Sequence, residues 1–219
     1  MQFSQVKHQI QLLKDPSFGH IRIGGGYSFL HYYLPDLLVN QQTDRPNLTF
    51  SLRTLTSHQV YELIEQYKLD FGFVTTVKPS HHIEQIDLPI FSTIKVIAPP
   101  SFPAKDTLTF KELETLPIIL FDEQSSFTQT ILQKLPVQVN VKVVVDHIDS
   151  AIRLVEKGVG ISIIPLRPDN EECRFKCLEL EEDIFPSTSI SLIYRKNRYL
   201  PPSFVQFIDK LTTFWKRKN

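Results

Sequence analysis

The sequence predicts an α/β protein built from two similar lobes, each with a parallel sheet covered by helices. Strand-like segments alternate along the chain with segments whose apolar residues recur every three or four positions, as they do on a helix. Strands joined by amphipathic helices favour parallel pairing with both sheet faces covered. A less regular, proline-containing stretch at 76–106 separates two such regions, which indicates two lobes and a cleft.

The clearest local pattern lies at 146–165. Its helix carries an apolar stripe at i, i+3, i+4 and i+7, formed by Ile148, Ala151, Ile152 and Val155. Gly158 can adopt the left-handed conformation that ends a helix. After Gly160, the apolar run 161–164 predicts a buried strand, and we expect Pro165 to stop it.

The remaining elements follow from the same rules. We expect strands at 20–24, 48–55, 69–75, 91–98, 117–121, 139–146, 174–180 and 189–195. We expect helices at 29–41, 57–67, 110–116 and 126–135, and a last one with an apolar face from Phe204 to Trp215. Pro35 should kink the first helix or limit its first turns. Val60, Leu63, Ile64 and Tyr67 should share one face of the second.

The N-terminal segment is expected to be an arm outside the main body. Phe3, Val6, Ile10 and Leu13 have the 3-4-3 spacing of a short coiled coil, and Pro16 follows.

Bulk properties exclude several classes of protein. The 24 basic and 24 acidic residues balance, so no overall field attracts nucleic acid or an anionic membrane. The sequence has neither a signal peptide pattern nor an apolar run long enough to span a membrane. Cys173 and Cys177 would lie about 13 Å apart on one strand, too far for a disulfide, and we expect both to stay reduced. We therefore predict a cytoplasmic protein.

No motif indicates an enzyme, a cofactor or a metal. The chain has no P-loop, no Gly-x-Ser-x-Gly elbow and no His-Glu-x-x-His. The stretch 24–29, GGGYSF, is not a dinucleotide fingerprint, because the last glycine of the Gly-x-Gly-x-x-Gly pattern is missing. His81-His82 has no partner at a recognised metal spacing.

Polar residues at predicted helix starts are the candidate binding residues. In open α/β lobes, ligands bind beyond the carboxyl ends of strands, where helix N-termini favour anions. The residues in such positions are Tyr27, Ser28, Thr56, Ser57, Ser125, Ser126, Phe127, His147 and Ile148. Each hydroxyl could instead cap its helix with no ligand present. His147 could pair with an anion, with a charge that changes near pH 6.5, or be a partly buried, hydrogen-bonded histidine.

Several motifs in order carry a family resemblance. They are the stretch 21–24 followed by Ser28 and by 34–38, Ser57 ahead of 69–73, and the stretch 155–165. From about Gly19 to Trp215 the chain resembles the effector-binding domain of LysR-type transcriptional regulators. The resemblance implies a fold of two Rossmann-like lobes similar to type 2 periplasmic binding proteins, with two strands crossing between the lobes. It places lobe I at 19–93 and 190–219, and lobe II at 94–189.

The resemblance also implies a function. Effector contacts would fall on Ser28, Ser57, Ser126, Phe127, His147 and Ile148. Residues 1–18 would be the remnant of a linker helix, and DNA would be bound only through a winged helix-turn-helix that this chain lacks. The resemblance implies a homodimer or homotetramer in which lobe I of one chain meets lobe II of another.

We therefore expect a sensor that binds a small, carboxylate-type anion in the interlobe cleft and rearranges its oligomer. Alternatives are a cytoplasmic or transport-type solute-binding protein of the same fold, or an enzyme on a related fold, although no paired carboxylates or activated nucleophile support the latter.

Overall fold

The structure, a computed structural model, describes residues 19–44, 47–76, 78, 80–121, 126–167, 174–185, 187–197 and 199–216. The predicted arm at 1–18, Ser125 and Cys173 lie outside the described residues. Two compact units are present. The described residues up to Phe91, together with those from Ser189 onward, form unit 1, and Ser92–Thr188 forms unit 2.

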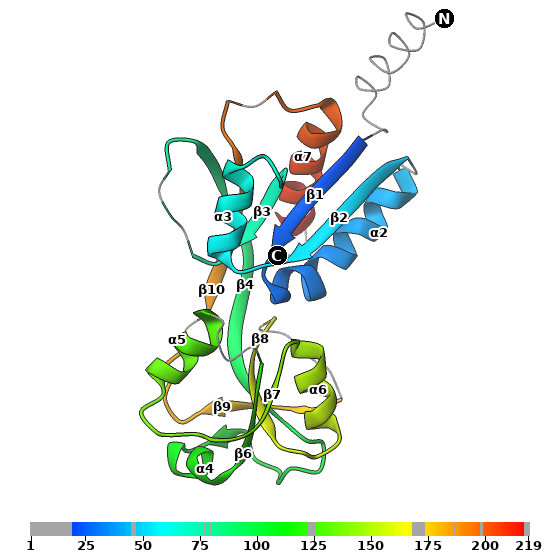
Figure 1. Cartoon of the computed structure of the whole chain (residues 1–219). Helices are drawn as coiled ribbons and strands as arrows, with labels where there is room; N and C mark the ends of the chain where they lie inside the picture. Colours follow the sequence, from blue (N-terminus) through cyan, green and yellow to red (C-terminus); the bar gives the residue numbers. More distant parts are fainter. Residues whose placement is uncertain are drawn as a thin grey trace, which may run out of the picture. The chain divides into compact units, whose positions relative to one another are not determined.

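Unit 1 contains a mixed sheet (Figure 1). Its strands are β1 (Gly19–Gly25), β2 (Leu48–Thr54), β3 (Phe71–Val74), the first part of β4 (Ile83–Ala98) and β10 (Thr188–Arg195), in the order β2-β1-β3-β10-β4. β1 pairs in parallel with β2 and β3, as predicted. The expectation of a wholly parallel sheet is wrong, because β10 returns from the far end of the chain and pairs antiparallel with β3.

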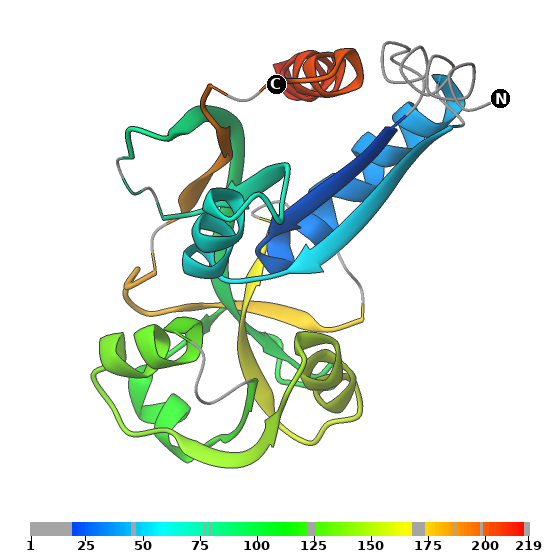
Figure 2. The same cartoon turned by 45° about the horizontal axis from the view of Figure 1, so that its top comes forward.

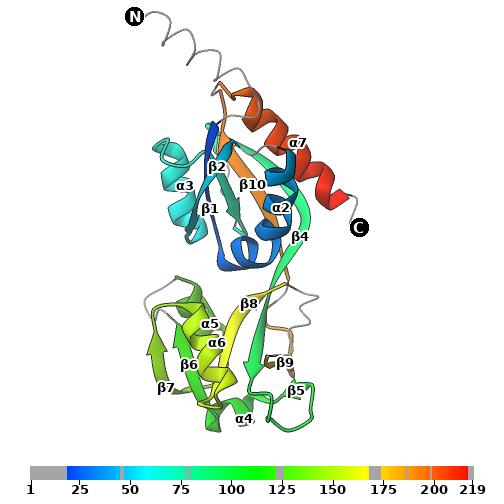
Figure 3. The same ribbon diagram turned by 90° about the vertical axis from the view of Figure 1, so that its right-hand side faces the viewer.

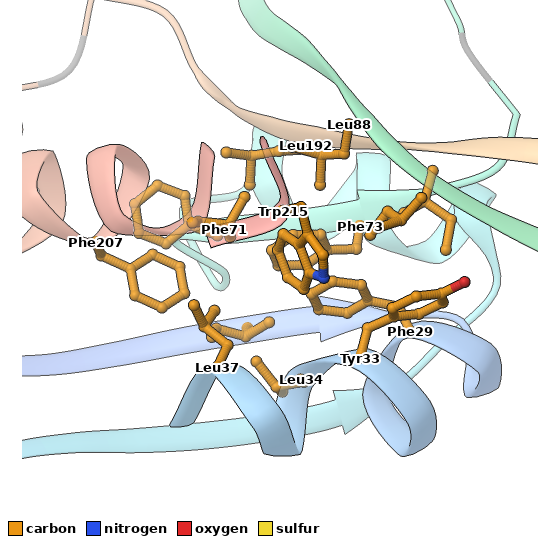
Figure 4. Close-up of a cluster of buried hydrophobic side chains, with 14 of the residues drawn as sticks. Phe29, Tyr33, Leu34, Leu37, Phe71, Phe73, Leu88, Leu192, Phe207 and Trp215 are labelled. Atoms are coloured by element: carbon orange, nitrogen blue, oxygen red, sulfur yellow. The ribbon is translucent and has the colours of Figure 1, made fainter. Parts of the chain in front are cut away.

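Helices cover both faces of this sheet (Figure 3). They are η1 (Phe29–Tyr33, a π-helix), α2 (Leu34–Asp44), α3 (Ser57–Glu65) and α7 (Pro202–Lys216). η1, α2 and α7 pack on one face over an aromatic core, and α3 packs on the other through Val60 and Ile64. Within the aromatic core, the rings of Phe29 and Phe73 stack 3.5 Å apart (Figure 4).

Two helices of unit 1 differ from the prediction at their ends. The turns before Pro35 form a π-helix instead of an α-helix, in which Leu34 N–H donates to Phe29 O. Pro35 has no N–H for an α-helical bond to the preceding turn. The second helix ends at Glu65 rather than residue 67, because Tyr67 is left-handed (φ 59°) and Lys68 N–H closes the turn on Leu63 O at 2.8 Å. Tyr67 is therefore exposed and does not share the apolar face.

The strand expected at 91–98 is much longer. β4 starts at Ile83 and contains Pro89, and it passes from unit 1 into unit 2 between Phe91 and Ser92. The prolines of 76–106 predict irregular structure, but Pro89 lies within β4, where a proline removes only one ladder hydrogen bond.

Unit 2 repeats the α/β architecture. Its other strands are β5 (Thr107–Leu108), β6 (Pro117–Phe121), β7 (Asn140–Val145), β8 (Ile161–Leu166) and β9 (Lys176–Leu180), and its helices are α4 (Phe110–Thr115), α5 (Ser126–Lys134) and α6 (Ile148–Glu156). β6 pairs in parallel with β7 and β8, whereas β4 pairs antiparallel with β8 and β9. α6 lies on one face, and α4 and α5 lie on the other (Figure 1).

The pattern at 146–165 folds largely as predicted. The four stripe residues of α6 are buried, and Gly158 has φ +80° just after the helix. Pro165 does not stop the strand, because β8 continues to Leu166 with Pro165 paired to Ile94 of β4.

Candidate functional site

In unit 1, two candidate helix starts follow strands that end side by side (Figure 2). Gly25 of β1 pairs with Thr54 of β2, and Leu55 N–H donates to Gly25 O at 2.9 Å. The loops that lead to Ser28 and to Ser57 therefore begin at one sheet edge. The end of β3 joins them, because Thr75 N–H donates to Ser57 Oγ at 3.2 Å. Thr75 was not a candidate from sequence, and only the folded sheet places it beside Ser57.

Ser57 is held so that its hydroxyl can donate. Its Oγ accepts from Thr75 N–H, which leaves the hydroxyl hydrogen available. Within the described part of the chain, no residue accepts that hydrogen. The backbone N–H groups of Ser57 and His58 lie in the first turn of α3, where no intrahelical acceptor exists. This helix start therefore offers hydrogen-bond donors.

The hydroxyl of Thr56, by contrast, caps the helix. Its Oγ1 accepts from Gln59 N–H at 3.3 Å and donates to Gln59 Oε1 at 3.2 Å, while Thr56 N–H donates to the same Oε1 at 3.0 Å. This reciprocal capping box uses the hydroxyl both as a donor and as an acceptor, so the capping interpretation describes Thr56. The Thr-x-x-Gln pattern of the sequence could have predicted it.

Ser28 and Tyr27 stand at the start of η1. Ser28 is only 4% exposed, is the N-cap residue of η1 and makes no side-chain capping bond. The half-buried ring of Tyr27 stacks on His31 with a centroid distance of 4.8 Å. The capping interpretation therefore does not describe Ser28.

The glycines before Ser28 have different reasons to be glycine. A Cβ on Gly24 would lie 2.4 Å from Leu69 Cδ1, and one on Gly25 would lie 3.1 Å from Phe73 Cβ. A Cβ on Gly26 would meet nothing within 4 Å. The first two glycines thus allow close packing of β1, and the third borders open space.

In unit 2, the remaining candidates also follow adjacent strand ends. Phe121 of β6 pairs with Val145 of β7, and the helices after these strands begin at Ser126 and Ile148. Phe127 is half-buried, with its ring 5.3 Å from that of Phe121. Ser125 lies outside the described residues.

His147 and Ile148 differ sharply in exposure. Ile148 is 6% exposed and belongs to the buried stripe of α6. His147 is the N-cap residue of α6; its side chain is exposed and makes no capping bond. The interpretation of His147 as a partly buried histidine is therefore wrong.

Beneath the unit 1 edge, an ion pair fixes β1 to the segment before β3. Asp70 is 3% exposed and accepts from Arg22 Nε at 3.0 Å, from the Arg22 guanidinium at 2.8 Å and from Arg22 N–H at 2.9 Å. The side-chain hydrogen bond that Arg22 donates to Asp70 raises the pKa of Arg22. This pair stabilises the framework that carries both loops.

Two further pairs of titratable side chains lie close together within their units. Lys95 Nζ lies 2.5 Å from Glu179 Oε1, and His58 Nδ1 lies 3.8 Å from Glu62 Oε1. Among the residues that the structure describes, no group of three His, Cys, Asp or Glu side chains is placed to hold a metal ion. No helix in the same residues is long and apolar enough to cross a membrane.

Comparison with known proteins agrees with this architecture. The family model of the LysR substrate binding domain matches residues 14–216. An uncharacterised HTH-type transcriptional regulator of Bacillus subtilis, YybE, is 24% identical over 217 residues, which cover 94% of this chain and 73% of that protein. An uncharacterised HTH-type transcriptional regulator of Escherichia coli, YeiE, is 24% identical over 207 residues, which cover 91% of this chain and 69% of that protein.

Solved structures show the same fold. The effector binding domain of QuiR in complex with shikimate has a TM-score of 0.70 and 21% identity, with coverage of 91% of this chain and 98% of that one. The regulatory domain of Synechocystis PCC6803 CcmR in complex with 2-PG has a TM-score of 0.73 and 18% identity, with coverage of 90% and 98%.

Proposed function

Since this chain belongs to the LysR substrate binding domain family, a family of ligand-sensing regulatory domains, we propose that it senses a small organic anion, of the carboxylate type, for a LysR-type transcriptional regulator. The observation that carries the proposal is the hydrogen bonding of the Ser57 hydroxyl. The hydroxyl oxygen accepts from Thr75 N–H, and within the described residues the hydroxyl hydrogen has no acceptor, so the group can donate to an oxygen of a ligand. The two N–H groups of the first turn of α3 add donors and a partial positive charge.

We assign units 1 and 2 to the two lobes of the family, at 19–93 with 190–219 and at 94–189. The proposed ligand contacts are Ser28 and Ser57 in unit 1 and Ser126, Phe127, His147 and Ile148 in unit 2. Tyr27 and Ser125 flank these residues. Thr56 contributes by ordering α3. Two similar domains are described with shikimate and with 2-PG, which supports a small-molecule effector.

The response would pass through a homodimer or homotetramer. An effector shifts an equilibrium only by its different affinity for two states, so it must favour one arrangement of the oligomer. DNA would be bound by a separate domain of the regulator, in the cytoplasm. The curated relatives are regulators, so a solute-binding protein of the same fold is not favoured.

Isothermal titration of the whole chain with shikimate, benzoate and citrate tests the proposal, with methyl shikimate as the uncharged counterpart. Ser57→Ala should weaken carboxylate binding about tenfold or more, since a hydrogen bond to a charged group contributes roughly 1.5–3 kcal/mol. It should leave the urea midpoint nearly unchanged.

Thr56→Ala is the matched control on the neighbouring residue. It should lower stability by about 1 kcal/mol through loss of the cap and weaken binding much less than Ser57→Ala. Binding of methyl shikimate as tight as that of shikimate, or an unchanged affinity in Ser57→Ala, would contradict the proposal.

A further inference from the structure

The end of η1 is connected to the strand that leaves unit 1 by a hydrogen bond from a buried side chain. Tyr33, the last residue of η1, is 8% exposed, and its hydroxyl donates to the backbone carbonyl of Phe91 on β4 at 2.6 Å. Its ring lies edge-on to Trp215, with centroids 6.3 Å apart. Figure 4 shows the Tyr33 ring inside the aromatic cluster with its hydroxyl oxygen at the cluster's edge.

The other end of η1 is the candidate site. Ser28 precedes the π-helix, and Phe29 is wedged against Phe73 of β3 with ring centroids 3.5 Å apart. Both rings are at most 1% exposed. Close-packed interiors transmit displacements rather than absorb them. A shift of the backbone at Ser28 therefore moves the short π-helix as a body, and Tyr33 moves with it.

Phe91 marks the point where the chain leaves unit 1. Two residues later Thr93 pairs with Leu166, and the ladder between β4 and β8 of unit 2 begins. The carbonyl bound by Tyr33 is thus covalently adjacent to the segment that passes between the units. No motif of the sequence points to this bond, because 58 residues separate its partners.

We propose that Tyr33 is a positioning residue that couples the effector site at the start of η1 to the crossing segment of β4, an inference that rests on the proposed function. Ligand contact at Ser28 shifts η1, and the Tyr33 hydroxyl transfers that shift to Phe91. Without the hydroxyl, the ligand still binds, but the crossing segment no longer responds.

A double-mutant cycle, measured by hydrogen–deuterium exchange, tests the coupling without any ligand. Ser28→Ala perturbs the site end, and Tyr33→Phe removes only the hydroxyl. In the otherwise wild-type chain, Ser28→Ala should speed exchange across 90–96 by about threefold, the scale of a modest net hydrogen-bond energy. Combined with Tyr33→Phe, Ser28→Ala should add almost nothing there.

Tyr61→Phe is the matched control. Tyr61 is also a buried tyrosine of unit 1, 6% exposed, with its hydroxyl accepting from Lys78 N–H at 2.9 Å. In this variant, the effect of Ser28→Ala on 90–96 should persist. An equal effect of Ser28→Ala with and without the Tyr33 hydroxyl, or no effect in the wild-type background, would overturn the coupling.

A second readout separates coupling from a structural role. With shikimate added, the wild-type chain should show slower exchange at 90–96. Tyr33→Phe should bind shikimate with a Kd within about twofold of wild type, because no proposed contact is changed, yet lose this protection. An equal loss of affinity and protection would mean that Tyr33 only stabilises the fold. If no carboxylate binds the wild-type chain, the proposed function fails, and the ligand-free cycle still decides the role of Tyr33.

Discussion

Helices α3 of unit 1 and α4 of unit 2 begin with the same threonine capping box. In α3, Gln59 N–H donates to Thr56 Oγ1 at 3.3 Å and Thr56 N–H donates to Gln59 Oε1 at 3.0 Å. In α4, Glu112 N–H donates to Thr109 Oγ1 at 3.2 Å, and Thr109 N–H donates to Glu112 Oε2 at 3.0 Å. The two starts differ in what lies beside the cap.

The start of α4 is occupied by a carboxylate of the chain itself. Phe110 N–H, the first of the helix, donates to Glu181 Oε1 at 2.6 Å. Ser57 holds the equivalent position in α3, and within the described residues its N–H has no such acceptor. The first N–H of α4 is thus satisfied within the chain, whereas the first N–H of α3 has no acceptor among the described residues, and this difference is the feature on which the proposed anion site depends.

The largest expected effect comes from disrupting the packing of α3 on its sheet. A Cβ on Gly72 would lie 2.3 Å from Val60 Cγ1 and 2.9 Å from Ile193 Cγ1, and both neighbours are fully buried. Gly72→Ala should therefore push α3 off the sheet and lower the free energy of unfolding by about 2 kcal/mol. Urea unfolding measures it.

Gly26→Ala is the control for that substitution, because a Cβ there meets nothing within 4 Å. It should leave stability within about 0.5 kcal/mol of wild type. Equal urea midpoints for the two variants would show that α3 is not seated as the structure has it.

A smaller effect is expected from removing the Glu181 carboxylate at the start of α4. Glu181→Ala removes the acceptor of Phe110 N–H and the negative charge at the helix N-terminus, and should destabilise unit 2 by about 1 kcal/mol. Glu182→Ala, one residue further on, should be nearly neutral, since among the described residues no helix N–H donates to the Glu182 side chain. Thermal unfolding of both variants compares them. If Glu182→Ala cost as much as Glu181→Ala, the internal-anion interpretation of α4 would fail.

Short-range patterns predicted the elements of both units well, because they depend on neighbouring residues. The stripe of α6 and the glycine that ends it are examples. The prediction was wrong at Pro89 and Pro165, which both lie inside strands. A strand tolerates a proline where no neighbouring strand requires a hydrogen bond from that residue's N–H, and the sequence does not show which strand will be the neighbour. The antiparallel return of β10 depends on pairing with β3, more than a hundred residues earlier.

The candidate site shows the same difference between local patterns, which the sequence reveals, and contacts between distant residues, which it does not. The sequence identified the hydroxyl at Ser57 but not the Thr75 N–H that its oxygen accepts, because that contact joins two loops 18 residues apart. It also identified Thr56 without showing that Gln59 uses the hydroxyl. The exposure of His147 and the burial of Ile148 follow from where α6 meets its sheet.

The smallest expected effect distinguishes the two capping boxes by pH. The hydrogen bond from Lys105, and then those from Thr109, lower the pKa of Glu112 to about 2, whereas Gln59 at the same position of α3 carries no charge. A carboxyl with a lowered pKa in the folded state contributes stability above its unfolded pKa, about 4.5, and loses it as the pH falls toward 2.

Glu112→Gln should keep the box, as Gln59 does, but remove this acid-dependent contribution. Urea midpoints at pH 7, 4.5 and 3 should therefore fall less steeply in Glu112→Gln than in wild type, whereas Gln59→Glu should make α3 acid-sensitive in the same range. Identical pH profiles for wild type and Glu112→Gln would show that the Lys105–Glu112 pair contributes nothing to the stability of α4.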